Sequence, residues 1–115
     1  MAFSLATRLV PEVVKSVAAA SIAAGYGSSI GTAFTQPMRI IFIQNLTDAL
    51  VMFSFNGIDD HFPLPANGFL LLDVSSNKSV SQAFFIAEGT RVFVKQIGVP
   101  TTGSVYVSGF YGALS

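Results

Sequence analysis

Short apolar runs, each followed by turn-forming residues, recur along most of the chain. Residues 39–44 are an almost continuous run of β-branched and aromatic side chains, which predicts a buried strand. Residues 49–55 and 91–97 alternate between two faces, which predicts strands with one buried side. Asn56-Gly57 follows the first of these directly and predicts a hairpin with a short strand near 59–63, because both central positions of that turn favour positive φ.

Further strands are expected at 69–74, 84–86 and 104–111. Asn and Asp in 45–48 indicate a turn in which their side chains bond nearby backbone amides. Residues 13–24 are ambiguous, since their alanines favour a helix while alternation and three valines favour a strand. We expect a strand there, and a helix stays open.

The spacing of these elements predicts an all-β protein. About eight short strands with turns between them, and no long amphipathic helix, are typical of a single antiparallel β-sandwich of jelly-roll-like type. A length of 115 residues fits one domain. We therefore expect an extended N-terminal arm over residues 1–12 and the sandwich over residues 13–115.

Apolar residues near both ends of the chain are candidates for subunit contacts. The first eleven residues show no clear period before Pro11, and an arm of this kind either frays or docks on a neighbour. The predicted assembly interface consists of Phe3, Leu5, Leu9, Val10, Phe110 and Tyr111.

Composition strengthens the expectation of subunit contacts. Only 10% of the residues are charged and 51% are hydrophobic, whereas about a quarter of an average soluble domain is charged. Much of the surface must therefore be neutral or apolar, and such surface usually meets another protein. A formal net charge of zero removes self-repulsion, so we expect a homo-oligomer.

The same features argue against several other classes of protein. The Lys and Arg residues are scattered singly, so no cluster is available to neutralise phosphates and direct nucleic-acid binding is not expected. No apolar run approaches the roughly 20 residues of a membrane helix. Glu12 and Lys15 interrupt the apolar N-terminal region, unlike in a secretory signal. Without cysteine, disulfides and thiolate metal sites are excluded.

Asp59-Asp60-His61 is the local cluster of titratable residues. A metal site needs ligands that converge from separate elements, whereas adjacent strand residues point to alternate faces, so Asp73 or Glu88 would have to complete it. We expect instead a solvated turn in which Asp accepts bonds from backbone amides. The chain has one histidine and no phosphate loop. We therefore predict no catalytic residue, no metal, no cofactor and no enzymatic activity.

A resemblance to a known family is carried by three segments: RIIFIQNLTDALVMFSFNGIDDHFPLPANGFLLLDVSSNKS, FFIAEGTRVFVKQ and PTTGSVYVSGFYG. Together they resemble small structural proteins of tailed-bacteriophage virions. The resemblance implies a β-sandwich that serves as a capsid decoration (cement) subunit and stabilises the shell. It also implies partners among the major capsid or connector proteins, a location in the virion after assembly in the host bacterial cytoplasm, and no active-site residues.

Two alternatives to a decoration subunit stay open. One is a component of the connector or adaptor ring at the head–tail junction. The other is a host-attachment module of fibre-tip or lectin-like type. Eleven phenylalanines and no tryptophan weaken a lectin role, since sugar sites usually stack on Trp or Tyr.

Overall fold

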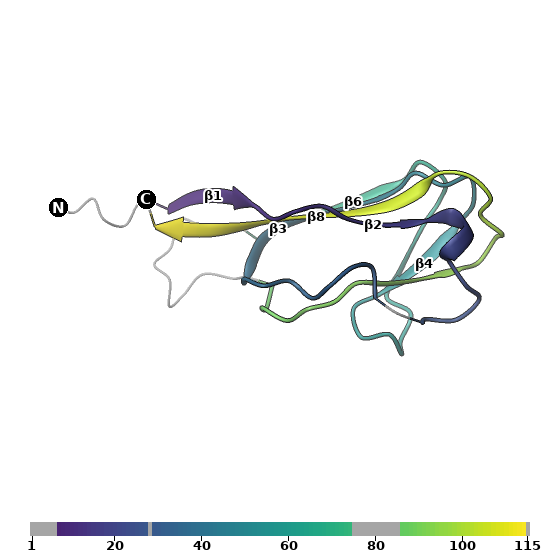
Figure 1. Ribbon diagram of the computed structural model, residues 1–115, viewed down its shortest axis with the longest axis horizontal. Coiled ribbons are helices and arrows are strands. Elements are labelled where there is room, and N and C mark those ends of the chain that lie inside the picture. The colour runs from purple at the N-terminus through teal and green to yellow at the C-terminus, as the bar shows by residue number, and fades with distance from the viewer. Residues whose placement is uncertain (1–6, 28, 75–85, 115) are drawn as a thin grey trace.

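The computed structural model describes residues 7–27, 29–74 and 86–114. The molecule is elongated, with extents of 55 × 24 × 19 Å, and the regular elements of its described residues are strands apart from one short 3-10 helix (Figure 1). Its elements are β1 (Thr7–Pro11), β2 (Lys15–Ala18), η2 (Ala19–Ser21), β3 (Met38–Asn45), β4 (Val51–Ser54), β5 (Phe62–Leu64), β6 (Phe69–Asp73), β7 (Phe93–Gln96) and β8 (Ser104–Leu114).

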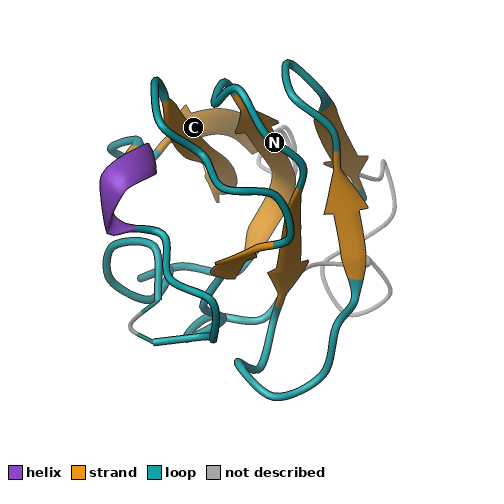
Figure 2. Ribbon diagram, turned by 90° about the vertical axis from the view of Figure 1, so that its right-hand side faces the viewer, coloured by secondary structure: helices purple, strands orange, loops and turns teal. Residues whose placement is uncertain are grey.

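The strands form two antiparallel sheets that pack as a sandwich (Figures 1 and 2), which confirms the predicted fold class. The larger sheet has the order β1-β8-β3-β6, with β2 also paired to β8, and the smaller sheet has the order β5-β4-β7. Strand β8 is the longest, with 11 residues, and organises the larger sheet. It pairs with β3 along one edge, and along the other edge with β2 near its start and β1 near its end.

The core lies between the two sheets. Along β3 and β8 every second side chain points toward the smaller sheet, because successive strand residues face opposite sides. The core residues contributed by the strands of both sheets are buried: Met38, Ile41, Ile43, Val51, Phe53, Leu64, Val94, Val105 and Val107.

The ambiguous segment 13–24 contains both an extended and a turned part. Residues 15–18 form β2, as expected, whereas the alanine-rich residues that follow form the 3-10 helix η2. Ile22 closes this turn by donating its backbone N–H to the Ala19 carbonyl at 3.1 Å. In the described part of the predicted arm, residues 7–11 form strand β1 of the larger sheet. Of the strand expected at 84–86, Ile86 forms a single bridge to Met38, and residues 84–85 lie outside the described residues.

The hairpin predicted around Asn56-Gly57 is present, but the predicted two-residue turn is wrong. Strands β4 and β5 pair antiparallel, and residues 55–61 connect them. Gly57 has a φ of 74°, whereas Asn56 is not among the residues with positive φ. Ser54 Oγ instead accepts the Asn56 and Gly57 amides, and Asn56 Oδ1 accepts those of Ile58 and Asp59. Side-chain acceptors thus shape a longer loop.

Within the described ranges, no helix has the length and apolar character needed to cross a membrane.

Candidate assembly surfaces

The larger sheet has a second face, directed away from the smaller sheet, which we call the outer face. Strand register defines its residues, because side chains opposite one another on paired strands point to the same side. The outer face comprises Leu9 and Pro11 of β1, Ser16 and Ala18 of β2, Ile40, Phe42 and Gln44 of β3, Phe69, Leu71 and Asp73 of β6, and Tyr106, Ser108 and Phe110 of β8.

The outer face is mostly apolar, although no element of the smaller sheet covers it and Ser16, Gln44, Asp73 and Ser108 also lie on it. Antiparallel sheets with one solvated face normally place polar residues on that face. Here Phe69 is 63% exposed and Leu71 is 53% exposed, and the Phe69 ring meets that of Phe42 edge-on at 5.5 Å. Asp73 is the charged residue among these register positions. Depletion of charge and enrichment in aromatic residues are the marks of the buried centre of a protein interface.

A ribbon of two strands extends from one end of the sandwich (Figure 1). It consists of β1 and the last residues of β8, paired from Pro11 opposite Phe110 to Thr7 opposite Leu114. The register of β3 with β8 ends at Met38 opposite Tyr111. Among the described strands, the ribbon beyond that point therefore has two members, and an isolated two-stranded ribbon is marginally stable in water.

The structure brings four of the six predicted interface residues together. Val10 lies opposite Tyr111, and Leu9 is two positions away from Pro11, which lies opposite Phe110. The four divide between two faces, because Leu9 and Phe110 belong to the outer face while Tyr111 packs against the core. Their role in assembly stays a prediction. Phe3 and Leu5 lie outside the described residues.

The centre of the outer face was not predicted from the sequence. Residues 39–44 were expected to form a buried strand, whereas Ile40 and Phe42 turn away from the smaller sheet. The sequence does carry a signal for this exposed face, because apolar and polar side chains do not alternate within residues 39–44. An apolar run without polar interruptions in an antiparallel sheet supplies two apolar faces, of which the core covers one.

The Asp59-Asp60-His61 cluster is dispersed among separate partners. Asp59 accepts a bond from the Asn56 side-chain amide at 2.9 Å, and His61 Nδ1 accepts the Phe55 N–H at 2.9 Å. Among the described residues, no group of three or more His, Asp or Glu could hold a metal ion. The expectation that Asp side chains bond the backbone of this turn is corrected, because Ser54 and Asn56 accept those amides.

Asp60 instead joins two residues that are distant in sequence. Its Oδ1 accepts a hydrogen bond from the Tyr26 hydroxyl at 2.8 Å and forms an ion pair with Lys95 at 2.9 Å. The Lys95 ammonium also lies 4.9 Å from the centre of the Tyr26 ring. Bonds from Lys95 and Tyr26 lower the pKa of Asp60, while burial and the bond to Asp60 raise the pKa of Tyr26. This exposed trio fastens the chain around Tyr26 to β7.

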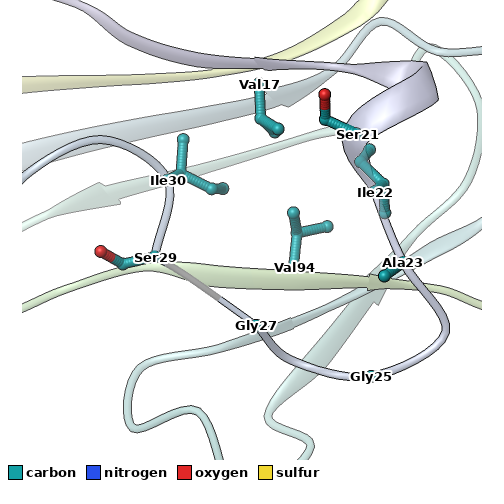
Figure 3. A pocket seen from close by; sticks show the side chains of 9 residues that line it. All are labelled: Val17, Ser21, Ile22, Ala23, Gly25, Gly27, Ser29, Ile30 and Val94. Atoms are coloured by element: carbon teal, nitrogen blue, oxygen red, sulfur yellow. The ribbon is translucent and has the colours of Figure 1, made fainter.

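A pocket of about 300 Å³ lies between β2 and β7, beside the residues of η2 (Figure 3). Val17 of β2 and Val94 of β7 point into it, together with Ile22 and Ile30 from the connection that follows η2. Its remaining lining residues are Ser21, Ala23, Gly25, Gly27 and Ser29. Because none of these side chains is ionisable, the pocket suits an apolar group.

The loops at the start of β8 are held by polar side chains that have their partners within the chain. Asn45 is fully buried, and its Nδ2 donates to the Ala49 and Leu64 carbonyls, each at 2.9 Å. Its Oδ1 accepts the Thr47 hydroxyl at 2.6 Å. Asp48 accepts the Thr101 backbone N–H at 2.8 Å and the Thr101 hydroxyl, and these bonds lower its pKa to about 2. This cluster braces the loops and offers no open site.

Comparison with known proteins adds no relative. No family model matches the chain, and no curated protein is significantly similar to it in sequence. The resemblance to virion structural proteins therefore stays a prediction, and the functional inference depends on the surfaces described above.

Proposed function

We propose that this chain is a structural subunit of a bacteriophage virion, a capsid decoration subunit that binds the shell through the outer face of its larger sheet. The observation that carries the proposal is the exposure of large apolar residues on that face, where Phe69 is 63%, Leu71 53% and Leu9 49% exposed. The low overall charge supports it further, since 10% charged residues leave little ionic surface for other kinds of binding.

The attachment would depend on apolar burial. Full burial of one large apolar side chain contributes about 1.5–3 kcal/mol. Several such residues lie side by side on the outer face, from Phe69 and Leu71 across Phe42 to Phe110. An interface of this composition weakens little as salt rises, because it contains few charges for salt to screen. A decoration subunit held in this way would stiffen the shell by bridging its subunits.

A ring component at the head–tail junction is the second candidate. The observation that favours it is the ribbon of β1 and β8, which projects along the long axis and exposes Leu9 to 49%. A projecting ribbon is suited to pairing with the next subunit of a ring, because its edge strand offers unpaired backbone groups. Electron microscopy of particles separates the two candidates. A decoration subunit covers the shell, whereas a ring component occupies one vertex.

The outer face can be tested with one exposed substitution and a matched control. Leu71→Glu places a second carboxylate near Asp73 on the outer face, while Ile58→Glu alters a residue that is 82% exposed in the connection between β4 and β5. We expect Leu71→Glu to abolish incorporation into particles and Ile58→Glu to leave it unchanged. Both variants should unfold cooperatively, with similar midpoints by circular dichroism. Normal incorporation of folded Leu71→Glu would overturn the proposed attachment surface.

A further inference from the structure

The pocket between β2 and β7 has the size and chemistry to hold a large apolar side chain. Its volume of about 300 Å³ is at the lower end of the range for small-molecule sites, about 300–1,000 Å³. Figure 3 shows Val17, Ile30 and Val94 pointing toward its centre, while the hydroxyl oxygens of Ser21 and Ser29 point away. Ser29 Oγ is already engaged, since it donates to the Gly31 carbonyl at 2.8 Å and accepts from Arg91 at 3.0 Å. Because neither hydroxyl points into the pocket, the side chains that line it favour an apolar occupant.

The pocket also borders a strand edge that can accept another strand. In the described part of the chain, β8 is the strand to which β2 is hydrogen-bonded, so the opposite edge of β2 has no partner strand. An extended segment can add to such an edge through backbone hydrogen bonds and insert every second side chain into a neighbouring pocket. The occupant that this geometry favours is therefore an extended peptide with alternating large apolar residues.

The first six residues of this chain have that pattern. Met1, Phe3 and Leu5 are large and apolar, and they alternate with the small residues at positions 2, 4 and 6. In an extended conformation the three large side chains point to one side. The segment carries no charged side chain, which matches a pocket without ionisable groups.

The segment cannot reach the pocket of its own molecule. It joins β1 at Thr7, which lies opposite Leu114, whereas the pocket residue Val17 lies opposite Val105, nine positions back along β8. Nine residues of strand span about 30 Å. Phe3 is four residues from Thr7, and an extended chain of that length spans at most about 14 Å. Only the pocket of another molecule is within reach.

From these observations we propose that the pocket between β2 and β7 receives residues 1–6 of a second copy of this chain, with Phe3 as the inserted side chain. The inference deepens the proposed assembly role, on which it rests, by naming a second copy as one partner. The segment joins β1 at one end of β8, whereas the pocket lies toward the other end, so two copies can exchange segments reciprocally or pass them on head-to-tail. Head-to-tail contacts build rings if the rotation closes and filaments if it does not.

Paired cysteines test this contact directly, because the chain has no native cysteine. Ser4→Cys keeps Phe3 and Leu5 in place, and Ala23→Cys marks the pocket lining. The two purified single variants are mixed under mild oxidation, and the disulfide-linked peptides are quantified by mass spectrometry. The control pairs Ser4→Cys with Ala66→Cys, an exposed alanine between β5 and β6 that does not line the pocket.

We expect the linkage from position 4 to position 23 to exceed the linkage to position 66, and adding Phe3→Ala to the Ser4→Cys variant to lower it by about 10- to 100-fold. Equal yields at positions 23 and 66, or a yield unaffected by Phe3→Ala, would overturn the inference. An intramolecular disulfide in the Ser4→Cys/Ala23→Cys double variant would overturn it as well, because it would show that the segment reaches its own pocket.

This outcome is separable from that of the proposed function. If the linkage fails while Leu71→Glu still abolishes incorporation into particles, the exchange of the N-terminal segment is wrong and the outer-face attachment stands. Deletion of residues 1–6 gives a second readout by sedimentation velocity. The deletion should reduce the protein to monomers, and oligomers that persist at the same size would contradict the exchange.

Discussion

At Ser104 strand β8 begins among loops that buried and capped polar groups hold in place, whereas at its other end it continues as a ribbon with exposed apolar side chains. At the first end Asn45 bonds three backbone carbonyls, those of Ala49, Leu64 and Pro65. At the second end Leu9 is 49% exposed and the ribbon pairs only two strands beyond Tyr111 within the described residues.

The difference separates stability within one chain from contacts between chains. Buried polar groups that are fully hydrogen-bonded specify one arrangement of the loops around them, since any other arrangement leaves those groups without partners. Exposed apolar groups contribute little to the folded monomer and gain free energy when a partner covers them. The loops at the first end are thus fixed by contacts within the chain, although Leu46, Ile97 and Val99 are exposed there, and we propose that the outer face serves association.

The largest effect is expected at Asn45. Replacing Asn45 with Ala leaves buried carbonyls without a donor, and each unsatisfied buried group costs about 1–3 kcal/mol, so we expect a loss of about 3 kcal/mol or more in the free energy of unfolding. Leu9→Asn in the ribbon, at an exposed position, should change it by less than about 0.5 kcal/mol. Urea unfolding followed by circular dichroism measures both. Similar losses of unfolding free energy in the two variants would contradict the proposed difference between the two ends of β8.

A smaller loss in the free energy of unfolding is expected at Gly103, which directly precedes β8 and lies against Leu46. Gly103 has a φ of 84°, and a Cβ at this position would collide with the Leu46 carbonyl. Gly103→Ala should therefore cost about 2 kcal/mol or more, because backbone strain and steric overlap add. Gly89 is a matched control, since its φ is 88° and no atom lies within 4 Å of a Cβ there. Gly89→Ala should cost about 1 kcal/mol, and equal costs in thermal melts would mean that the close approach at Leu46 is unimportant.

The smallest effect is a dependence on pH from Asp48. Hydrogen bonds from Thr101 and Thr102 lower the pKa of folded Asp48 from 3.8 to about 2. The folded carboxylate is therefore favoured above pH 3.8, and its contribution to stability is lost as pH falls through about 2. Asp48→Asn should lower the unfolding midpoint at pH 7, and the difference from the unaltered protein should shrink between pH 4 and pH 2. A difference independent of pH would show that the charge of Asp48 is not responsible.

The strands were predictable from the sequence, but which face of each strand packs against the core was not. The apolar runs at 39–44 and 69–74 correctly predicted β3 and β6, since β-branched and aromatic residues favour strands. Neither run shows which of its faces turns toward the core, because both faces are apolar. That follows from register, which places Phe42 opposite Leu71 and Ser108 on the outer face.

Polar contacts between residues close in sequence were predictable, whereas those between distant residues were not. The turn expected at 45–48 is present, because the Asn45 side chain accepts the backbone N–H of Thr47 two residues later. The bond from Asn45 to the Leu64 carbonyl and the ion pair of Asp60 with Lys95 join residues far apart in the chain. Both depend on how the sheets pack, for which a local pattern of residues carries no signal.

The central claim is that a larger assembly covers the outer face of the β1-β8-β3-β6 sheet. Hydroxyl-radical footprinting with mass spectrometry tests it directly by comparing the free protein with the protein in assembled particles. We predict that oxidation of Phe42, Phe69 and Leu71 falls several-fold on assembly, while oxidation of Ile58 is unchanged. Equal oxidation of the outer-face residues in the free and assembled states would contradict the account.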